Sequence, residues 1–404
     1  MAGGLGDIRG RAARVVFGGL AAQLGLGCVY LSSPLSPAML AEFGWSRAEL
    51  MVAGSPRTIV IALASPLVGM LTARFGARPV IAISITLIGV VFAGYSAVEE
   101  LWQLFALSIA IGLVVAGVGD IAVGTVVSKW IVRGRGLALG ICYAGSNLGG
   151  LIVSLAAAWI LGFATWRDAY LWVGIGAVVF LLPLVLVCVR EPPPEAAHDA
   201  TAEKVSADLT DAHGIDVAAA LRTRDFWVLG VALFFFYFYY VGVTGHLVLY
   251  LTDLGLPIAE ASVGFGITVF LGVGAKLGIG LFADRWPAKS ALLLNFAVVL
   301  AASLLLLGVP AVGYLPLFIV AYGFATAAQN VVYPMIVAQR FGTLHMARIY
   351  GVLMLALLPG GILGPIFAGW MFDRAGSYML AFQVFAALNA IGFLGLCTLR
   401  TRRD

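Results

Sequence analysis

The sequence predicts an all-α membrane protein with twelve transmembrane helices, and three observations support this fold class. Hydrophobic residues make up 62% of the 404 residues, and the mean hydropathy is +1.03. Charged residues make up only 11%, whereas soluble domains carry about 25%. The apolar residues also gather in long runs, each long enough for a helix to cross about 30 Å of hydrocarbon. Helices are the expected spanning structure because their backbone hydrogen bonds are internal.

Twelve such runs follow one another, separated by connections that hold nearly all the charges. The first six lie near residues 15–35, 48–72, 79–98, 102–128, 136–162 and 169–189. The second six lie near residues 226–251, 260–283, 288–309, 314–338, 348–371 and 378–399. The first run follows three arginines, but it is longer than a signal-peptide core and lacks a small-residue cleavage pattern. We therefore expect an uncleaved first helix.

One long polar segment divides the chain into two halves. It covers residues 191–221, begins with three prolines and is rich in Ala, Asp and Glu, a composition typical of a flexible linker. We expect an N-terminal six-helix bundle over residues 1–190, a cytoplasmic linker over 191–221 and a C-terminal six-helix bundle over 222–404. A short interfacial helix is expected within 215–227, leading into the seventh span.

The distribution of cations predicts the orientation of these spans. Of the 24 Lys and Arg residues, only Arg47, Arg167 and Arg374 fall in connections on the side opposite the N-terminus, and Arg57 and Lys276 fall within spans. Cytoplasmic connections carry an excess of Lys and Arg. We therefore expect a multi-pass protein of the inner (cytoplasmic) membrane with both termini in the cytoplasm. The same bias accounts for the basic pI without a nucleic-acid partner.

Three charged residues, Arg57, Asp120 and Lys276, lie inside apolar spans. A charge at the bilayer centre costs at least about 2.5–3.5 kcal/mol, so such residues are candidates for function. Arg57 is roughly 14 Å from the outer end of its span at 1.5 Å per residue. It is expected either to pair with Asp120 or to bind an anionic substrate. Asp120 is expected to act as a fixed counterion or as a proton carrier.

A loop motif occurs once in each half. Residues 69–76 follow the second span and residues 280–285 follow the eighth, which predicts an internal repeat. The motif resembles the signature of the major facilitator superfamily, with Ala73 where the first copy usually has an acid. The resemblance implies the major facilitator fold, with two six-helix bundles and a binding site near the midplane. It also implies that the motif residues act in conformational change: Gly69, Arg74, Gly76, Gly280, Asp284 and Arg285.

Three further segments are similar to the monocarboxylate transporters and the oxalate/formate antiporter family. They are Phe43–Leu50, Lys129–Gly140 and Ala220–Trp227. In the monocarboxylate carriers a basic residue of span eight, four positions before the motif glycine, binds the substrate carboxylate. The resemblance implies this role for Lys276, although the usual residue there is arginine. The alternative is that its ammonium reaches the membrane interface.

Other polar residues of the spans are candidates for a substrate pocket, or else they join helices to one another. The predicted substrate-binding set is completed by Tyr30, Tyr143, Asn147, Gln329, Asn330 and Tyr333. His246 titrates near neutral pH when unperturbed, so it is expected either to relay protons or to pack and hydrogen-bond. The four cysteines fall singly and show no metal-type spacing, so no metal or cofactor is expected.

We therefore expect a secondary active transporter of small organic anions, monocarboxylates or short dicarboxylates, that works by alternating access. Its expected partners are the carboxylate substrate, protons or a counter-anion, and the bilayer, and it is expected to be monomeric. One alternative is a multidrug or amphiphile exporter that uses the aromatic run 234–240. Another is a membrane sensor that does not translocate its ligand. No nucleotide-binding loop or nucleophile with a base is visible, so no enzyme is expected.

Overall fold

The computed structural model describes residues 10–131, 135–191, 214–283, 286–309, 313–342 and 344–399, and the regular elements in these ranges are all helices. Eleven helical stretches of this part of the chain are long and apolar enough to cross a membrane. The remaining predicted span corresponds to α16 (Tyr314–Phe341), which is apolar over Tyr314–Ala325. The predicted all-α membrane fold is confirmed.

The N-terminal spans are built from these helices: α1 (Arg11–Gly27), the 3₁₀ turn η1 (Cys28–Leu31), α2 (Ser32–Phe43), α3 (Arg47–Gly54), α4 (Pro56–Phe75), α5 (Ala77–Ser96), α6 (Leu101–Val118), α7 (Asp120–Trp130), α8 (Arg135–Ile160), α9 (Trp166–Gly176), the π-helical turn η2 (Ala177–Leu181) and α10 (Leu182–Cys188). The C-terminal spans follow the short helix α12 (Val217–Leu221) and are built from α13 (Arg224–Asp253), α14 (Ile258–Ala283), α15 (Ala288–Gly308), α16, α17 (Met346–Met354), α18 (Leu357–Ala375) and α19 (Met379–Cys397).

The second span is interrupted at Ser55, between α3 and α4. Pro56 has no backbone N–H, so it cannot donate to the carbonyl of Val52 as a regular helix would require. The backbone N–H and the hydroxyl of Ser55 donate to that carbonyl instead, at 3.2 and 2.8 Å. The break therefore leaves the Val52 oxygen satisfied, as backbone groups inside a membrane must be.

The fourth span is interrupted more sharply, at Gly119. This glycine has an extended backbone (φ −75°, ψ −173°) between the end of α6 and the start of α7. Asp120 is the first residue of α7, where the backbone N–H groups of a helix end favour a negative charge. The sequence predicted this span as one uninterrupted run, because nothing local distinguishes Gly119 from the other glycines around it.

The chain forms two compact units. Unit 1 contains the described residues of 1–43, 52–208 and 257–269, and unit 2 contains those of 44–51, 209–256 and 270–404. Each unit thus includes a short stretch from the other half of the sequence. Unit 2 includes residues 44–51, which lead into α3 and form most of it. Unit 1 includes residues 257–269, which form the first part of α14.

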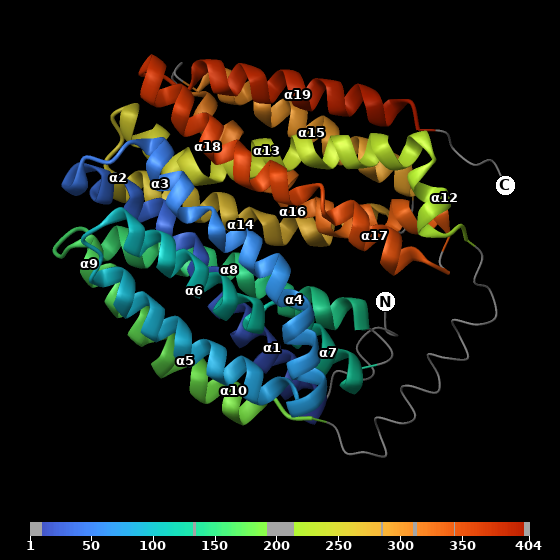
Figure 1. The fold of residues 1–404 in the computed structure, drawn as a ribbon, viewed down its shortest axis with the longest axis horizontal. Helices are drawn as coiled ribbons and strands as arrows, with labels where there is room; N and C mark the ends of the chain where they lie inside the picture. Colours follow the sequence, from blue (N-terminus) through green and yellow to red (C-terminus); the bar gives the residue numbers. More distant parts are fainter. Residues whose placement is uncertain are drawn as a thin grey trace. The chain divides into compact units, whose positions relative to one another are not determined.

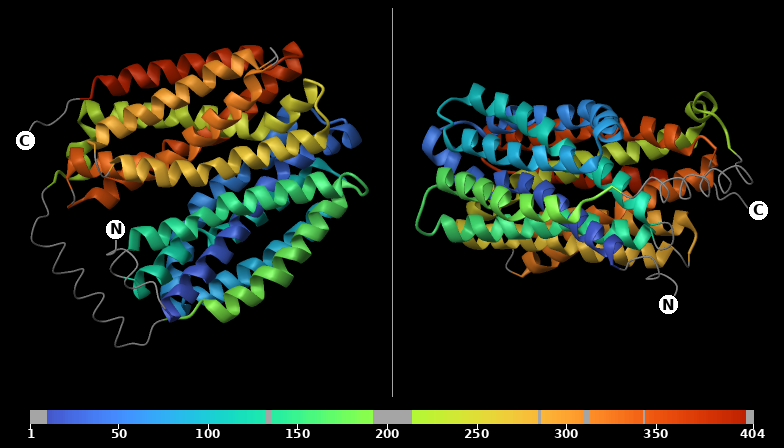
Figure 2. Two further views of the ribbon diagram at one scale, coloured as in Figure 1. Left: turned by 180° about the vertical axis from the view of Figure 1, so that it is seen from behind. Right: turned by 90° about the horizontal axis from the view of Figure 1, so that it is seen from below.

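Helix pairing follows the same order in both units. In unit 1, α1 packs along α8 and α5 along α9, so the first span contacts the fifth and the third contacts the sixth. In unit 2, α13 packs along α18 and α15 along α19, which are the seventh with the eleventh and the ninth with the twelfth. Figure 1 shows α13 beside α18, and the rear view in Figure 2 shows α15 in orange along α19 in red. This recurrence fits the predicted internal repeat.

Glycines let the paired helices approach closely. A Cβ on Gly27 of α1 would lie 2.6 Å from the Cα of Gly149 on α8. A Cβ on Gly364 of α18 would lie 2.0 Å from the carbonyl oxygen of Phe238 on α13. Both distances are far inside van der Waals contact, so each helix pair depends on the missing side chain.

Candidate functional site

The two charged residues inside the spans of unit 1 lie at the two helix breaks. Arg57 is the second residue of α4, directly after the Ser55 interruption, and Asp120 begins α7 directly after Gly119. Discontinuous helices of this kind are where transporter folds place backbone and side-chain groups that bind substrates and ions. The breaks therefore mark the candidate site of unit 1.

Arg57 is half-buried and faces polar groups of other helices. Its Nη1 donates to the carbonyl of Val29, which lies in the η1 turn, at a long distance of 3.4 Å. Two tyrosines of the same unit, Tyr95 and Tyr170, stack with 4.9 Å between their ring centroids. Among the described residues the guanidinium forms no ion pair with Asp120, which was one of the two expectations for it.

Asp120 is held by two neighbouring helices. The Nε2 of Gln23, on α1, donates to the Asp120 carboxylate at 2.9 Å. The hydroxyl of Tyr143, on α8, donates to the Asp120 backbone carbonyl at 3.3 Å. Gly124, one turn along α7, leaves room for that tyrosine, since a Cβ there would lie 2.8 Å from its hydroxyl. Residues of α1 and α8 thus meet the start of α7 at Asp120, one at its carboxylate and one at its backbone carbonyl.

Gln23 is a candidate residue that the sequence reasoning missed. Its side chain is fully buried, and its Oε1 accepts no hydrogen bond from the residues that the structure describes. A buried polar group without a partner is costly, so it calls for an explanation when it contacts a charged residue. The available signal was a lone glutamine in the middle of the first apolar span.

The other predicted pocket residues of unit 1 contact the first part of α14. Asn147 donates through Nδ2 to the carbonyl of Val269 at 2.7 Å. The ring of Tyr30 packs against Phe265 with 6.1 Å between centroids. These two residues connect η1 and α8 to α14 within unit 1, whereas Tyr143 contacts α7. Their role in substrate binding stays a prediction.

The predicted site residues of the second half are placed on α14 and α16. Lys276 is partly buried and lies in α14, on the part that belongs to unit 2. Tyr333 is fully buried, and its hydroxyl donates to the carbonyl of Leu229 on α13 at 3.3 Å. Gln329 and Asn330 lie in α16, but their side chains are outside what the structure describes.

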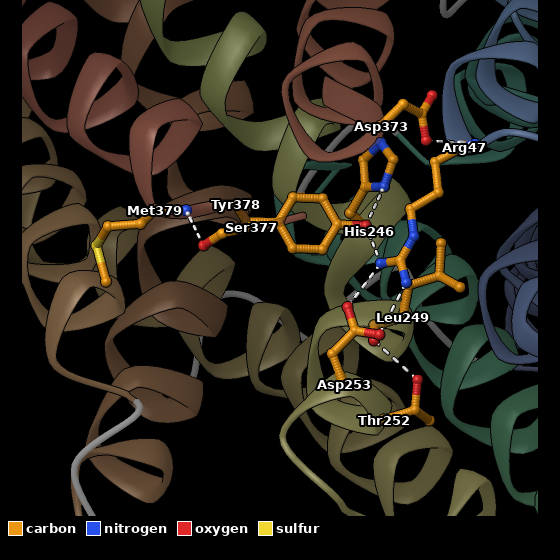
Figure 3. A network of polar contacts seen from close by, with 9 residues as sticks. All are labelled: Arg47, His246, Leu249, Thr252, Asp253, Asp373, Ser377, Tyr378 and Met379. Carbon is orange, nitrogen blue, oxygen red and sulfur yellow. Dashed lines mark hydrogen bonds and ion pairs between the residues drawn. The ribbon is translucent and has the colours of Figure 1, made fainter. Parts of the chain in front are cut away.

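A polar network within unit 2 surrounds Arg47 (Figure 3). Its guanidinium binds both carboxylate oxygens of Asp253, at 2.7 and 2.8 Å, and donates to the hydroxyl of Tyr378 at 2.5 Å. The guanidinium carbon lies 3.5 Å from the ring centroid of Phe372. The backbone N–H groups of Arg47 and Ala48, which start α3, donate to the carboxylate of Asp373 at 3.0 and 2.8 Å. One arginine is therefore fixed from both its side chain and its backbone.

His246 continues this network into the interior. Its Nε2 lies 2.8 Å from the carbonyl of Pro365, which can only accept, so Nε2 carries a hydrogen. Its Nδ1 lies 2.9 Å from the Tyr378 hydroxyl. Burial raises the pKa of Tyr378, although Arg47 opposes the effect, so the phenol keeps its proton and donates to Nδ1. The chain of hydrogen bonds runs from Arg47 through Tyr378 and His246 to Pro365. A role for His246 in proton coupling stays a prediction.

The first copy of the loop motif joins α4 to α5 through Gly76, whose φ of +84° favours glycine. The carboxylate of Glu191 accepts from the N–H of Ala77 at 2.8 Å and from the Nζ of Lys129 at 2.8 Å. An acid from the end of the sixth span thus caps α5. The remaining motif residues are placed as follows: Gly69 and Arg74 lie on α4, Gly280 lies on α14, and Asp284 and Arg285 lie outside the described residues.

No group of three or more His, Cys, Asp or Glu side chains that could hold a metal ion occurs in the described part of the chain. The candidate site residues that the structure describes carry cationic, carboxylate, phenol and amide groups inside membrane helices. Such groups bind and release ions and polar solutes.

Comparison with known proteins identifies the family. The Major Facilitator Superfamily model matches residues 15–356. Human monocarboxylate transporter 11 is 27% identical over 354 residues, which cover 82% of this chain and 71% of that protein. The oxalate:formate antiporter of Oxalobacter formigenes is 27% identical over 328 residues, which cover 80% of this chain and 76% of that protein.

Solved structures agree on the fold. The nucleoside transporter NupG superposes with a TM-score of 0.76 at 15% identity, over 96% of this chain and 99% of that chain. A bacterial homologue of the human lysosomal transporter Spinster superposes with a TM-score of 0.69 at 15% identity, over 96% of this chain and 93% of that chain. The family match spans both halves of the chain, and the helical fold agrees with it. The chain therefore belongs to the Major Facilitator Superfamily, and it is a membrane transporter and not an enzyme.

Proposed function

We propose that the protein is a secondary active transporter of small organic anions, monocarboxylates or short dicarboxylates, that works by alternating access. The observation that carries the proposal is Arg57, a half-buried guanidinium at a helix break inside an apolar span. Among the described residues its side chain makes one hydrogen bond, and that bond is long, at 3.4 Å. The similarity to a monocarboxylate transporter and an oxalate:formate antiporter supports the same class of substrate.

The chemistry of Arg57 fits a carboxylate. A guanidinium has five N–H donors in a planar fork and stays charged at any physiological pH, so two donors can bind both oxygens of a carboxylate. Its position on the first turn of α4 adds the positive end of that helix. Lys276 is the proposed second cation and contributes a point charge without a fork. The phenols and amides predicted for the pocket would add hydrogen-bond donors.

The proposed driving force is proton symport or anion exchange, with Asp120 as the coupling residue or counterion. An excess cation in a membrane transporter resists reorientation until an anion neutralises it, because moving an uncompensated charge through a low-dielectric region is costly. Gln23 and Tyr143 fix Asp120 at the start of α7, so its charge is held in one place relative to unit 1. The proposed setting is the inner membrane, with both termini in the cytoplasm and the protein as a monomer.

Counterflow in proteoliposomes tests the proposal. Vesicles loaded with one carboxylate should accumulate a labelled carboxylate from a panel of monocarboxylates and short dicarboxylates. We expect Arg57→Ala and Lys276→Ala each to lower carboxylate affinity at least about tenfold, since a hydrogen bond to a charged group contributes about 1.5–3 kcal/mol. The carboxylate affinity of Arg57→Lys should lie between those of the parental protein and Arg57→Ala, because lysine keeps the positive charge but lacks the planar fork of donors.

Lys289 supplies the matched control. It is a cation of unit 2 whose Nζ donates to the carbonyls of Leu399 and Cys397, so Lys289→Ala should leave carboxylate affinity unchanged. An imposed pH gradient should drive uptake if coupling uses protons, and Asp120→Asn should abolish that response while exchange persists. Transport of lipophilic cations that survives Arg57→Ala, without carboxylate transport, would favour an amphiphile exporter instead.

A further inference from the structure

We propose that Gln23 and Asp120 form a proton-holding pair, in which the protonated carboxyl of Asp120 donates to Oε1 of Gln23 while it accepts from Nε2. The two side chains come from α1 and α7 of unit 1 and already share one hydrogen bond, of 2.9 Å. The inference rests on the proposed coupling role of Asp120. It deepens that role, because it names the coupled ion, a proton, and the neutral residue that helps to hold it.

The amide of Gln23 is only half satisfied. Its Nε2 donates to Oδ1 of Asp120. Its Oε1 is buried and has no hydrogen-bond donor among the residues that the structure describes. A buried acceptor without a donor costs roughly 1–3 kcal/mol, and native interiors keep few of them. The position of Oε1 beside a carboxylate therefore needs a donor to explain it.

A proton on Asp120 would supply that donor. An ionised carboxylate has only acceptors, so it accepts from Nε2 and offers nothing to Oε1. A protonated carboxyl has one O–H donor and keeps an acceptor on its other oxygen, and a primary amide carries the complementary donor and acceptor side by side. A rotation of the Gln23 amide about its Cγ–Cδ bond can bring the two planar groups face to face. They then exchange two hydrogen bonds, one in each direction.

The surroundings of Asp120 suit the uptake and release of a proton. Asp120 is exposed and starts α7 directly after the break at Gly119, whereas Gln23 is fully buried on α1. The hydroxyl of Tyr143 donates to the backbone carbonyl of Asp120, so this bond positions the residue without occupying its carboxyl group. A proton from water binds one carboxylate oxygen and returns to water when Asp120 ionises again. No other group has to change its protonation state.

The helices around α7 bring further charged and titratable groups. α7 packs against α1, α4, α5, α6 and α8, and α6 has no such residue. The thiol of Cys142, on α8, donates to the carbonyl of Val16 on α1. The remaining groups besides Tyr143 are Arg11 and Arg14 on α1, Arg57 and Arg74 on α4, Arg78 and Tyr95 on α5, Arg135 at the start of α8, and Lys129 on α7 itself. Arginine and lysine are donors only, so none of these cations can supply the acceptor that the Gln23 amide offers to a protonated carboxyl.

Infrared difference spectra between acidic and alkaline pH test the pair in lipid vesicles without any substrate. A protonated carboxyl group has a C=O stretching band that ionisation removes, and hydrogen bonds to the group lower its frequency. We expect such a band in the parental protein and its absence in Asp120→Asn. In Gln23→Leu the band should move to higher frequency, because leucine has a similar volume and makes neither of the two bonds.

Asn295→Leu is the matched control, since it removes a buried amide of unit 2 that donates to the carbonyl of Ala325. It should leave the Asp120 band at the parental frequency. Should Gln23→Leu fail to fold, Gln23→Met keeps the length of the side chain without its amide and should give the same shift. The proposal is overturned if no band depends on Asp120, or if the band keeps its frequency when the amide of Gln23 is removed. Because no anion is present, a failure of carboxylate transport does not affect this result.

Discussion

Gln23 determines how the carboxylate of Asp120 is held, although it carries no charge itself. Its amide reaches from α1 to the start of α7, and its buried Oε1 has no donor among the described residues. An amide is suited to this position because it offers a donor and an acceptor from one planar group. At the scale of single residues, a neutral side chain thus helps to hold the carboxylate of the candidate site.

Replacing Gln23 by leucine should impair transport with little change in folding. Leucine has a similar volume and fits a buried position, but it cannot donate to Asp120. Because a hydrogen bond to a charged group contributes about 1.5–3 kcal/mol, we expect the transport rate at low substrate concentration to fall about tenfold or more. Initial rates of counterflow over a range of substrate concentrations measure the effect.

Asn295→Leu is the control for Gln23→Leu. Asn295 is also a buried amide, and it donates to the backbone carbonyl of Ala325 within unit 2. Its replacement should lower stability without a comparable loss of transport. An equal loss of transport in both variants would assign Gln23 a general packing role.

At the scale of helices, the contacts of α13 with α18 and of α1 with α8 depend on glycine positions where a side chain has no space. The tighter of the two cases is Gly364, whose added Cβ would meet a backbone oxygen of α13. A flexible side chain can move away from such a contact, but a helix backbone cannot without separating the pair. The helix pair is therefore sensitive to the smallest possible substitution.

Gly364→Ala should lower the thermal unfolding midpoint in detergent by several degrees or prevent folding. Overpacking of a well-packed interior typically costs about 1–3 kcal/mol, and we expect the upper end because the neighbour is backbone. Gly351→Ala is the control, since a Cβ on that glycine of α17 meets nothing within 4 Å. It should be neutral or slightly stabilising, because alanine favours helix by about 1 kcal/mol over glycine. Similar midpoints for the two variants would contradict the close approach of α13 and α18.

For the whole molecule, the cations of its connections predict the orientation in the membrane, with both termini in the cytoplasm. A green fluorescent protein fused after the last residue should fluoresce, because this reporter folds on the cytoplasmic side. Alkaline phosphatase inserted after Leu254 should be active, because it needs the opposite side. The reverse pattern would contradict the predicted orientation.

The fold was predictable from the sequence to a greater extent than the site. Hydropathy predicts spans because the cost of leaving each residue in water or lipid is local and nearly additive. Contacts between distant residues are not local: Gln23 and Asp120 are 97 positions apart, and Arg47 and Asp253 are 206 positions apart. Arg57 and Asp120 stood out as charges in apolar runs, whereas their neutral and backbone partners did not.

The helix breaks were predictable only in part, for the same physical reason. Pro56 predicts an interruption, because a proline inside a helix lacks the N–H that would donate to the carbonyl four residues earlier. Gly119 is one of 50 glycines, and its extended conformation depends on packing against other helices. The contacts of Arg47 with Asp253 and Tyr378 could not be predicted, because a cation near the end of a span is expected whether or not it has partners.

The hydroxyl of Ser55 also bears on how the protein is made. A nascent second span enters lipid before most of its later neighbours have been synthesised, so it can rely only on bonds within itself. Because Ser55 already bonds the oxygen of Val52, the span from Arg47 to Phe75 can enter lipid with that carbonyl satisfied, despite the proline. The backbone N–H and the hydroxyl of Ser55 thus satisfy, from within the span, the carbonyl that Pro56 leaves without its regular donor.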